Sequence, residues 1–163
     1  MLNTHLRTVI IGFGIFLLQY FLSEHITIQQ IRPDFLVIFI IYVALSQGSF
    51  AGVIYGFCFG LVEDLVGVGS LFGLASLTKS ITGFLVGFLH GKYPKLNPFV
   101  FHLLWILIIS THFFIYIYIR FQTVYESSIF IFFKTWFLAL CYTLAFVGLF
   151  QLIHPIHKVY PTD

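Results

Sequence analysis

Charged residues are scarce in this chain. Lysine, arginine, aspartate and glutamate make up 9% of its 163 residues, whereas 60% of the residues are hydrophobic. A typical soluble domain carries about 25% charged residues, so this chain lacks the polar surface that a soluble globule needs. Its formal net charge of +2 is too small and too dispersed to indicate nucleic-acid binding. The composition predicts an all-α integral membrane protein with a single transmembrane domain over residues 1–163.

The residue patterns of enzymes and metalloproteins are also missing. Cys58 and Cys141 both lie inside apolar segments, so we expect free thiols and no structural disulfide. His102 and His112 would lie about 80° apart on a helix, and no further ligand pair accompanies them. The glycines of residues 67–69 lack the Gly-Lys-Ser/Thr continuation of a phosphate-binding loop. We therefore predict no catalytic residue, no cofactor and no metal site.

Apolar segments separated by short polar breaks predict six transmembrane helices, at about 7–23, 34–46, 48–62, 71–90, 98–119 and 129–153. The first segment continues without a small-residue cleavage site, so we interpret it as an uncleaved anchor. Residues 35–45 would extend about 17 Å as a helix, short of the roughly 30 Å hydrocarbon core. One helix over 33–62 would extend about 45 Å, which is too long without strong tilt. The polar break at 46–49 favours a tight hairpin of two short helices and local thinning of the bilayer.

The distribution of lysine and arginine indicates the topology. With six helices and a cytoplasmic N-terminus, the cytoplasmic segments contain Arg7, Lys92, Lys95 and Lys158. The outer loops then contain only Arg32 and Arg120. Five spans would reverse this ratio, because every loop after residue 62 would change sides. Cytoplasmic loops carry the excess of lysine and arginine, so we predict six spans with both termini in the cytoplasm.

Four glycines at intervals of four residues run along the third predicted helix: Gly48, Gly52, Gly56 and Gly60. Each is displaced by about 40° from the one before, so together they form a slanted groove without side chains. An interior glycine costs a helix about 1 kcal/mol relative to alanine in water. Four of them in register make sense where another backbone must come very close, as in small-xxx-small helix contacts in lipid. We predict helix packing, with a partner or within the chain, at these glycines.

The fourth predicted helix has a second face of small residues. On a face about 120° wide lie Gly73, Ser76, Lys79, Ser80, Gly83 and Gly87. Lys79 would sit about 12 Å from the outer end of this helix, near the bilayer midplane. A charge at that depth costs about 2.5–3.5 kcal/mol on insertion scales. Lys79 therefore either faces a cavity or a buried partner, for which we expect Asp64 or Glu63, or extends its side chain toward the outer headgroups.

Residues 32–34, Arg-Pro-Asp, begin the second predicted helix. Proline suits a first helical turn, and an aspartate complements the positive end of the helix dipole. The alternative to a simple helix start is a polar knot at the outer face with Glu63, Asp64 or Arg120. The candidate polar site therefore comprises Arg32, Pro33, Asp34, Glu63, Asp64 and Lys79.

The order of these motifs over residues 32–91 resembles the rod shape-determining protein family MreD. The length, the hydropathy and the N-terminal anchor fit the same family, whereas residues 98–163 match only as apolar helices. The resemblance implies a non-enzymatic, multi-pass scaffold subunit of the bacterial cell-elongation complex in the inner membrane, which supports cell shape and lateral peptidoglycan synthesis. It also implies binding to the membrane helix of MreC, and through it an assembly with MreB, RodA and a class B penicillin-binding transpeptidase.

Chains of this kind are similar in turn to the substrate-binding S subunits of energy-coupling-factor transporters, which form a six-helix bundle. That similarity implies an alternative function, the capture of a vitamin or another small solute. An S subunit needs outer loops whose aromatic and polar groups converge on the solute. The outer loops here are short and modestly polar, and the small-residue faces carry glycine in place of alanine. We therefore favour the scaffold function over solute capture.

Overall fold

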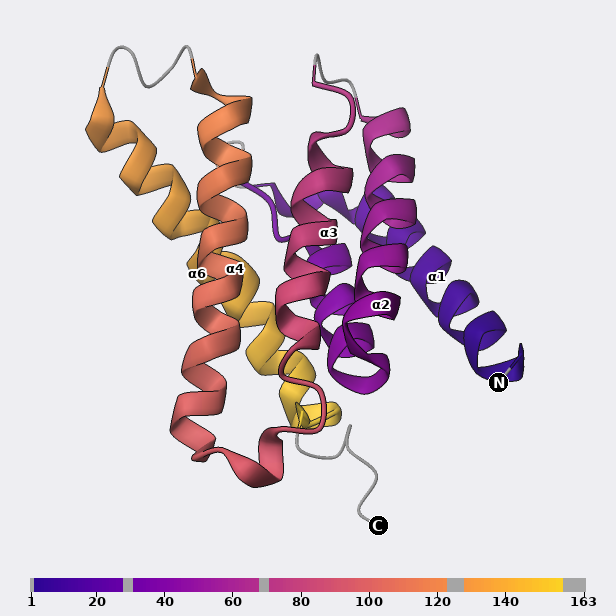
Figure 1. Ribbon diagram of the computed structural model, residues 1–163. Coiled ribbons are helices and arrows are strands. Elements are labelled where there is room, and N and C mark those ends of the chain that lie inside the picture. The colour runs from indigo at the N-terminus through magenta and orange to yellow at the C-terminus, as the bar shows by residue number, and fades with distance from the viewer. Residues whose placement is uncertain (1, 28–30, 68–70, 123–127, 157–163) are drawn as a thin grey trace.

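The computed structural model describes residues 2–27, 31–67, 71–122 and 128–156 (Figure 1). The helices of this part are α1 (Leu2–Ile26), α2 (Phe35–Val66), α3 (Leu74–Gly87), the short 3-10 helix η1 (Tyr93–Lys95), α4 (Pro98–Arg120) and α6 (Ile129–Ile153). By length and composition, α1, α2, α4 and α6 could each cross a membrane, whereas α3 is shorter. The expectation of an all-α protein with apolar helices long enough to cross a membrane is confirmed.

Helix α2 is broken at Gly48. This residue has a φ of 85° and a ψ of −178°, in the positive-φ region that glycine reaches without strain. The two halves fold back on each other, since the ring centroids of Phe39 and Phe59 are 5.4 Å apart. In an unbroken helix these residues would be about 30 Å apart. Figure 1 shows the first half of α2 leading into a turn and the second half returning beside it. The hairpin expected at residues 46–49 is thus present, inside one continuous element.

The first half of α2 lies at the centre of the molecule. Leu36, Val37, Ile40, Ala44 and Leu45 have no exposed surface. One side of this segment shares a core with α4 and α6, and the other side packs with α1 and the second half of α2. A helix that is apolar all round must be buried. This short apolar segment is therefore enclosed by the other helices and by the second half of α2.

Two helices differ in length from the expectation. Helix α1, at Leu2–Ile26, extends beyond 7–23 at both ends, while α3, at Leu74–Gly87, is shorter than 71–90. Gly73 precedes α3 with a φ of 95°, and this left-handed residue sets where the helix begins. The 14 residues of α3 extend about 21 Å, short of a roughly 30 Å hydrocarbon core.

Large apolar side chains cover the outside of the bundle. Phe50 is 80% exposed, Leu152 is 83% exposed, and further phenylalanines and leucines are exposed along α1, α4 and α6. In water this much exposed apolar surface would promote association. In a bilayer the same surface faces lipid tails, so the structure agrees with the membrane character that the composition predicts.

Candidate functional site

The second half of α2 and helix α3 approach each other backbone to backbone. A Cβ atom on Gly56 would lie 2.6 Å from the Lys79 carbonyl oxygen, and one on Gly60 would lie 2.5 Å from the Cα of Ser76. Gly52 faces the backbone of Gly83 in the same way, and a Cβ on Gly87 would meet the backbone of Ser49. No side chain fits at these contacts. The two small-residue faces are therefore used against each other, within the chain.

Gly48 and Gly73 have a different role. Both have positive φ, 85° and 95°, and a Cβ on Gly73 would meet nothing within 4 Å. A Cβ on Gly48 would make only an ordinary contact, 3.8 Å from a His90 ring carbon. Grouping these two with the helix-packing glycines is therefore wrong. They are needed for the turn in α2 and for the start of α3.

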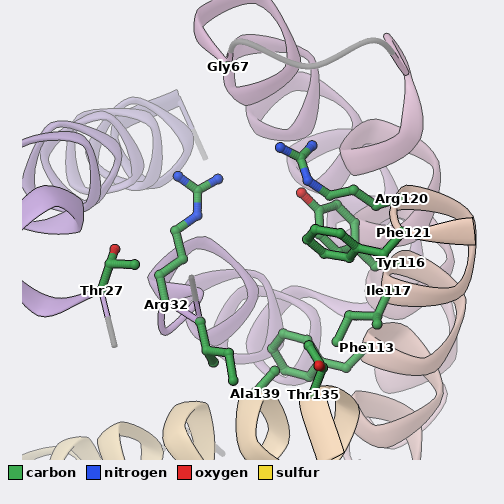
Figure 2. A pocket seen from close by; sticks show the side chains of 11 residues that line it. Thr27, Arg32, Gly67, Phe113, Tyr116, Ile117, Arg120, Phe121, Thr135 and Ala139 are labelled. Atoms are coloured by element: carbon green, nitrogen blue, oxygen red, sulfur yellow. The ribbon is translucent and has the colours of Figure 1, made fainter. Parts of the chain in front are cut away.

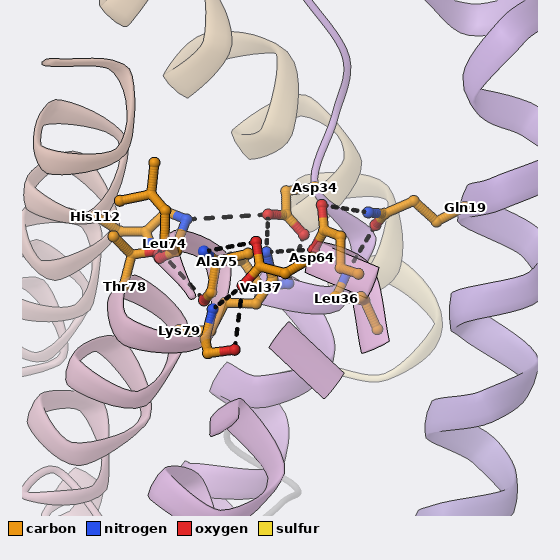
Figure 3. Close-up of polar contacts among 12 residues, drawn as sticks. Gln19, Asp34, Leu36, Val37, Asp64, Leu74, Ala75, Thr78, Lys79 and His112 are labelled. Carbon is orange, nitrogen blue, oxygen red and sulfur yellow. Dashed lines mark hydrogen bonds and ion pairs between the residues drawn. The ribbon is translucent and has the colours of Figure 1, made fainter. Parts of the chain in front are cut away.

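The close approach of α3 places Lys79 between two carboxylates. Its Nζ atom lies 2.6 Å from Asp34 Oδ2 and 2.7 Å from Glu63 Oε2, and its side chain is 0% exposed. Arg32 lies at the rim, with a guanidinium nitrogen 3.4 Å from Glu63 Oε1. We call these four residues, Arg32, Asp34, Glu63 and Lys79, the ion cluster. Figure 3 shows Lys79 and Asp34 together with neighbouring polar residues. Two cations balance two acids, as burial of charge requires, so Lys79 has the buried partners that were one of its two expected environments.

Asp64 belongs to a neighbouring arrangement. Its carboxylate accepts hydrogen bonds of 3.1 Å from the backbone N–H groups of Gly73, Ala75 and Ser76 and from the Ser76 hydroxyl. These contacts satisfy the unpaired donors of the first turn of α3 and complement its dipole. Of the two partners expected for Lys79, Glu63 is confirmed, and Asp34 is a second partner. The prediction of Asp64 as a partner is wrong.

Polar side chains from α1 and α6 complete the surroundings of the ion cluster. Gln19 donates from Nε2 to Glu63 Oε1 at 3.4 Å and accepts at Oε1 from the N–H of Leu36 at 3.0 Å. The Thr143 hydroxyl accepts from the Asp34 N–H at 3.3 Å. Sequence reasoning missed both residues. An amide inside the apolar first segment was the available signal for Gln19, while Thr143 gave none.

His112 brings α4 to the same site. Its Nε2 lies 3.9 Å from Asp34 Oδ2, and its Nδ1 lies 3.0 Å from the Thr82 hydroxyl. The Thr82 hydroxyl donates to the Thr78 carbonyl at 2.8 Å, so its oxygen is left to accept a hydrogen bond from the Nδ1–H group of His112. Among the described residues, no group of three or more His, Cys, Asp and Glu side chains could hold a metal ion. The arrangement holds helices together through paired charges.

Arg120, considered as a partner for the acids, lies elsewhere. Its guanidinium lies over the Tyr116 ring, 5.8 Å from the centroid, and 5.9 Å from that of Phe121. In the part of the chain that the structure describes, no acid forms an ion pair with it. Figure 2 shows Arg120 and Arg32 reaching from different segments into one space. The polar knot therefore forms with Glu63 and without Arg120.

A comparison with known protein families matches almost the entire chain, including the helices described above. The family model of the rod shape-determining protein MreD matches residues 3–159, nearly the whole chain. No curated protein and no solved structure matches it. The match includes residues 98–159, for which the sequence alone showed only apolar helices. The chain therefore belongs to the MreD family of rod shape-determining membrane proteins.

Proposed function

We propose that the chain is a non-enzymatic scaffold subunit of the bacterial elongation machinery in the inner membrane, where it binds MreC and supports lateral peptidoglycan synthesis. Family membership supports a role in rod-shape determination. The main structural support for the scaffold function is the ion cluster. Its charges are paired within the chain, and its members and their polar neighbours come from α1, α2, α3, α4 and α6. Such an arrangement specifies one packing of the helices, as buried polar contacts do in some proteins.

We further propose six membrane spans, with α2 contributing two, and with both termini in the cytoplasm. The fold-back at Gly48 supports this count, because the halves of α2 run in opposite directions. In Figure 1 the start of α1, the end of α6 and η1 lie toward the same end of the bundle. Lys92 and Lys95 accompany η1 at that end, as the positive-inside rule requires of a cytoplasmic face.

Cysteine labelling tests this topology. In a background where Cys58 and Cys141 are replaced by alanine, a membrane-impermeant maleimide added to spheroplasts should label Leu71→Cys and leave Lys92→Cys unlabelled. Leu71 precedes α3 and Lys92 follows it, so the pair reports on the two ends of one helix. Permeabilised cells provide the control, in which both positions should react. Labelling of position 92 in intact spheroplasts would overturn the topology.

We propose a groove on the outside of α2 and α3 as the binding site for the MreC helix. The facing glycines are occupied within the chain, so a partner must use another surface. This groove, of about 830 Å³, has an apolar lining that includes Val53, Phe57, Leu61 and Leu77. Ser80 also lines it, and a small hydroxyl residue allows a neighbouring helix to approach closely in lipid. The groove thus has an apolar lining and a small residue against which a transmembrane helix can pack.

Disulfide cross-linking tests this binding site and, with it, the scaffold function. Leu77→Cys, in the cysteine-free background, should cross-link to a cysteine placed along the MreC membrane helix, with a maximum every three to four positions of that helix. The matched control is Leu138→Cys, an exposed position on α6, which should give little product. Equal cross-linking from both positions would contradict the groove. Co-purification of a stoichiometric vitamin without MreC would favour the S-subunit function instead.

A further inference from the structure

A second hollow lies beside the ion cluster and is not explained by scaffolding. Its volume is about 420 Å³, within the range of roughly 300–1,000 Å³ that small-molecule sites occupy. Arg32 and Arg120 both line it, together with Tyr116 and the apolar residues Phe113, Ile117 and Ala139. Figure 2 shows the two guanidinium groups on one side of this space and Phe113 and Ala139 on the other. The cavity therefore has a cationic side and an apolar side.

The cationic side carries more charge than the neighbouring acids balance. Lys79 and Arg32 are offset by Asp34 and Glu63 in the ion cluster, and Asp64 is engaged by the first turn of α3. Arg120 adds a third cation, and no acid of the described chain pairs with it. It is held in place by lying over the Tyr116 ring. One positive charge is thus left facing the cavity.

Two guanidinium groups on one wall are suited to a phosphate group. Their planar sets of N–H donors match phosphate oxygens in a bidentate manner, and they stay charged at any physiological pH. The opposite wall, formed by Phe113, Ile117 and Ala139, favours an apolar chain and disfavours a fully hydrated ion. A ligand with both properties is a phosphate ester that carries an acyl or prenyl chain.

We propose that this cavity binds the phosphate group of an anionic ester, with Arg120 and Arg32 contacting its oxygens and its apolar chain lying against Phe113, Ile117 and Ala139. We take a membrane lipid headgroup as the source of this phosphate. Free phosphate has the same chemistry, and the experiments below distinguish the two sources. This site is separate from the groove on α2 and α3 and does not depend on the binding of MreC.

Native mass spectrometry of the full chain in neutral detergent tests the proposal. Dioleoyl phosphatidic acid should bind, while dioleoylglycerol, which lacks the phosphate, should not. Arg120→Gln should weaken phosphatidic acid binding about tenfold or more, as the loss of a charge-assisted contact predicts. Arg120→Lys should recover part of the affinity, because it restores the charge without the planar donors. Arg7→Gln, which removes an exposed arginine at the start of α1, is the matched control and should bind as the unaltered chain does.

A second variant tests the apolar wall without touching a charge. Ala139→Phe fills the cavity from α6 and should also abolish phosphatidic acid binding. If inorganic phosphate instead competes at equal concentration and Ala139→Phe has no effect while Arg120→Gln does, the phosphate site stands with free phosphate as its source. The proposal is overturned if Arg120→Gln, with an unchanged melting curve, binds phosphatidic acid like the unaltered chain. Equal binding of dioleoylglycerol and phosphatidic acid would also overturn it.

Discussion

Replacement of Lys79 by glutamine is expected to lower the free energy of unfolding by about 3–5 kcal/mol. The ammonium group is buried between Asp34 and Glu63, at 2.6 Å and 2.7 Å. Its removal leaves two buried carboxylates with only the half-exposed Arg32 as counter-charge. Thermal unfolding in detergent and complementation of rod shape measure the loss. Lys95→Gln, at an exposed lysine in η1, is the control and should change neither.

A second substitution should recover part of this loss. Glu63 keeps Arg32 when Lys79 is removed, so Asp34 is the acid left without a cation. Asp34→Asn combined with Lys79→Gln should therefore be more stable than Lys79→Gln alone, since asparagine can still accept the 2.9 Å hydrogen bond from the Val37 N–H at the start of α2. Strictly additive effects of the two substitutions would contradict the ion cluster as a unit.

Replacement of Gly56 by leucine should prevent α2 and α3 from packing. The atoms that a side chain would meet are the backbone carbonyl of Lys79 and the backbone nitrogen of Ser80, and neither can move without shifting α3. Overpacking typically costs about 1–3 kcal/mol and occasionally more, and immovable backbone atoms place this site at the upper end. The displacement would also withdraw Lys79 from its acids, so the loss should exceed that of an ordinary core substitution. We expect a lower melting temperature in detergent and loss of complementation.

The matched control is Gly14→Leu on α1, where an added Cβ meets nothing within 4 Å. It should leave the melting temperature nearly unchanged. Membrane insertion should be unaffected in both variants, because leucine is more favourable than glycine in a spanning segment. A Gly56→Leu protein that melts with the unaltered chain would show that the backbone contact contributes nothing to packing.

The sequence by itself determined the helical architecture and the position of the hairpin. A chain with so few polar residues must pair its backbone groups internally in lipid, and helices do so within one segment. The spacing of Gly52, Gly56 and Gly60 also identified a face that another backbone must touch, because only glycine leaves such a groove. These are local properties, so they can be read from residue type and interval.

The tertiary structure alone decided which acid neutralises Lys79. Glu63 and Asp64 are adjacent in sequence, but neighbouring positions on a helix differ by about 100° in direction. One therefore points to Lys79 and the other to the start of α3. Asp34 joins Lys79 only because α2 folds back at Gly48 and brings both ends of the hairpin together. The interval of four likewise includes Gly48, yet its positive φ makes it a turn residue, and only the path of the backbone reveals that difference.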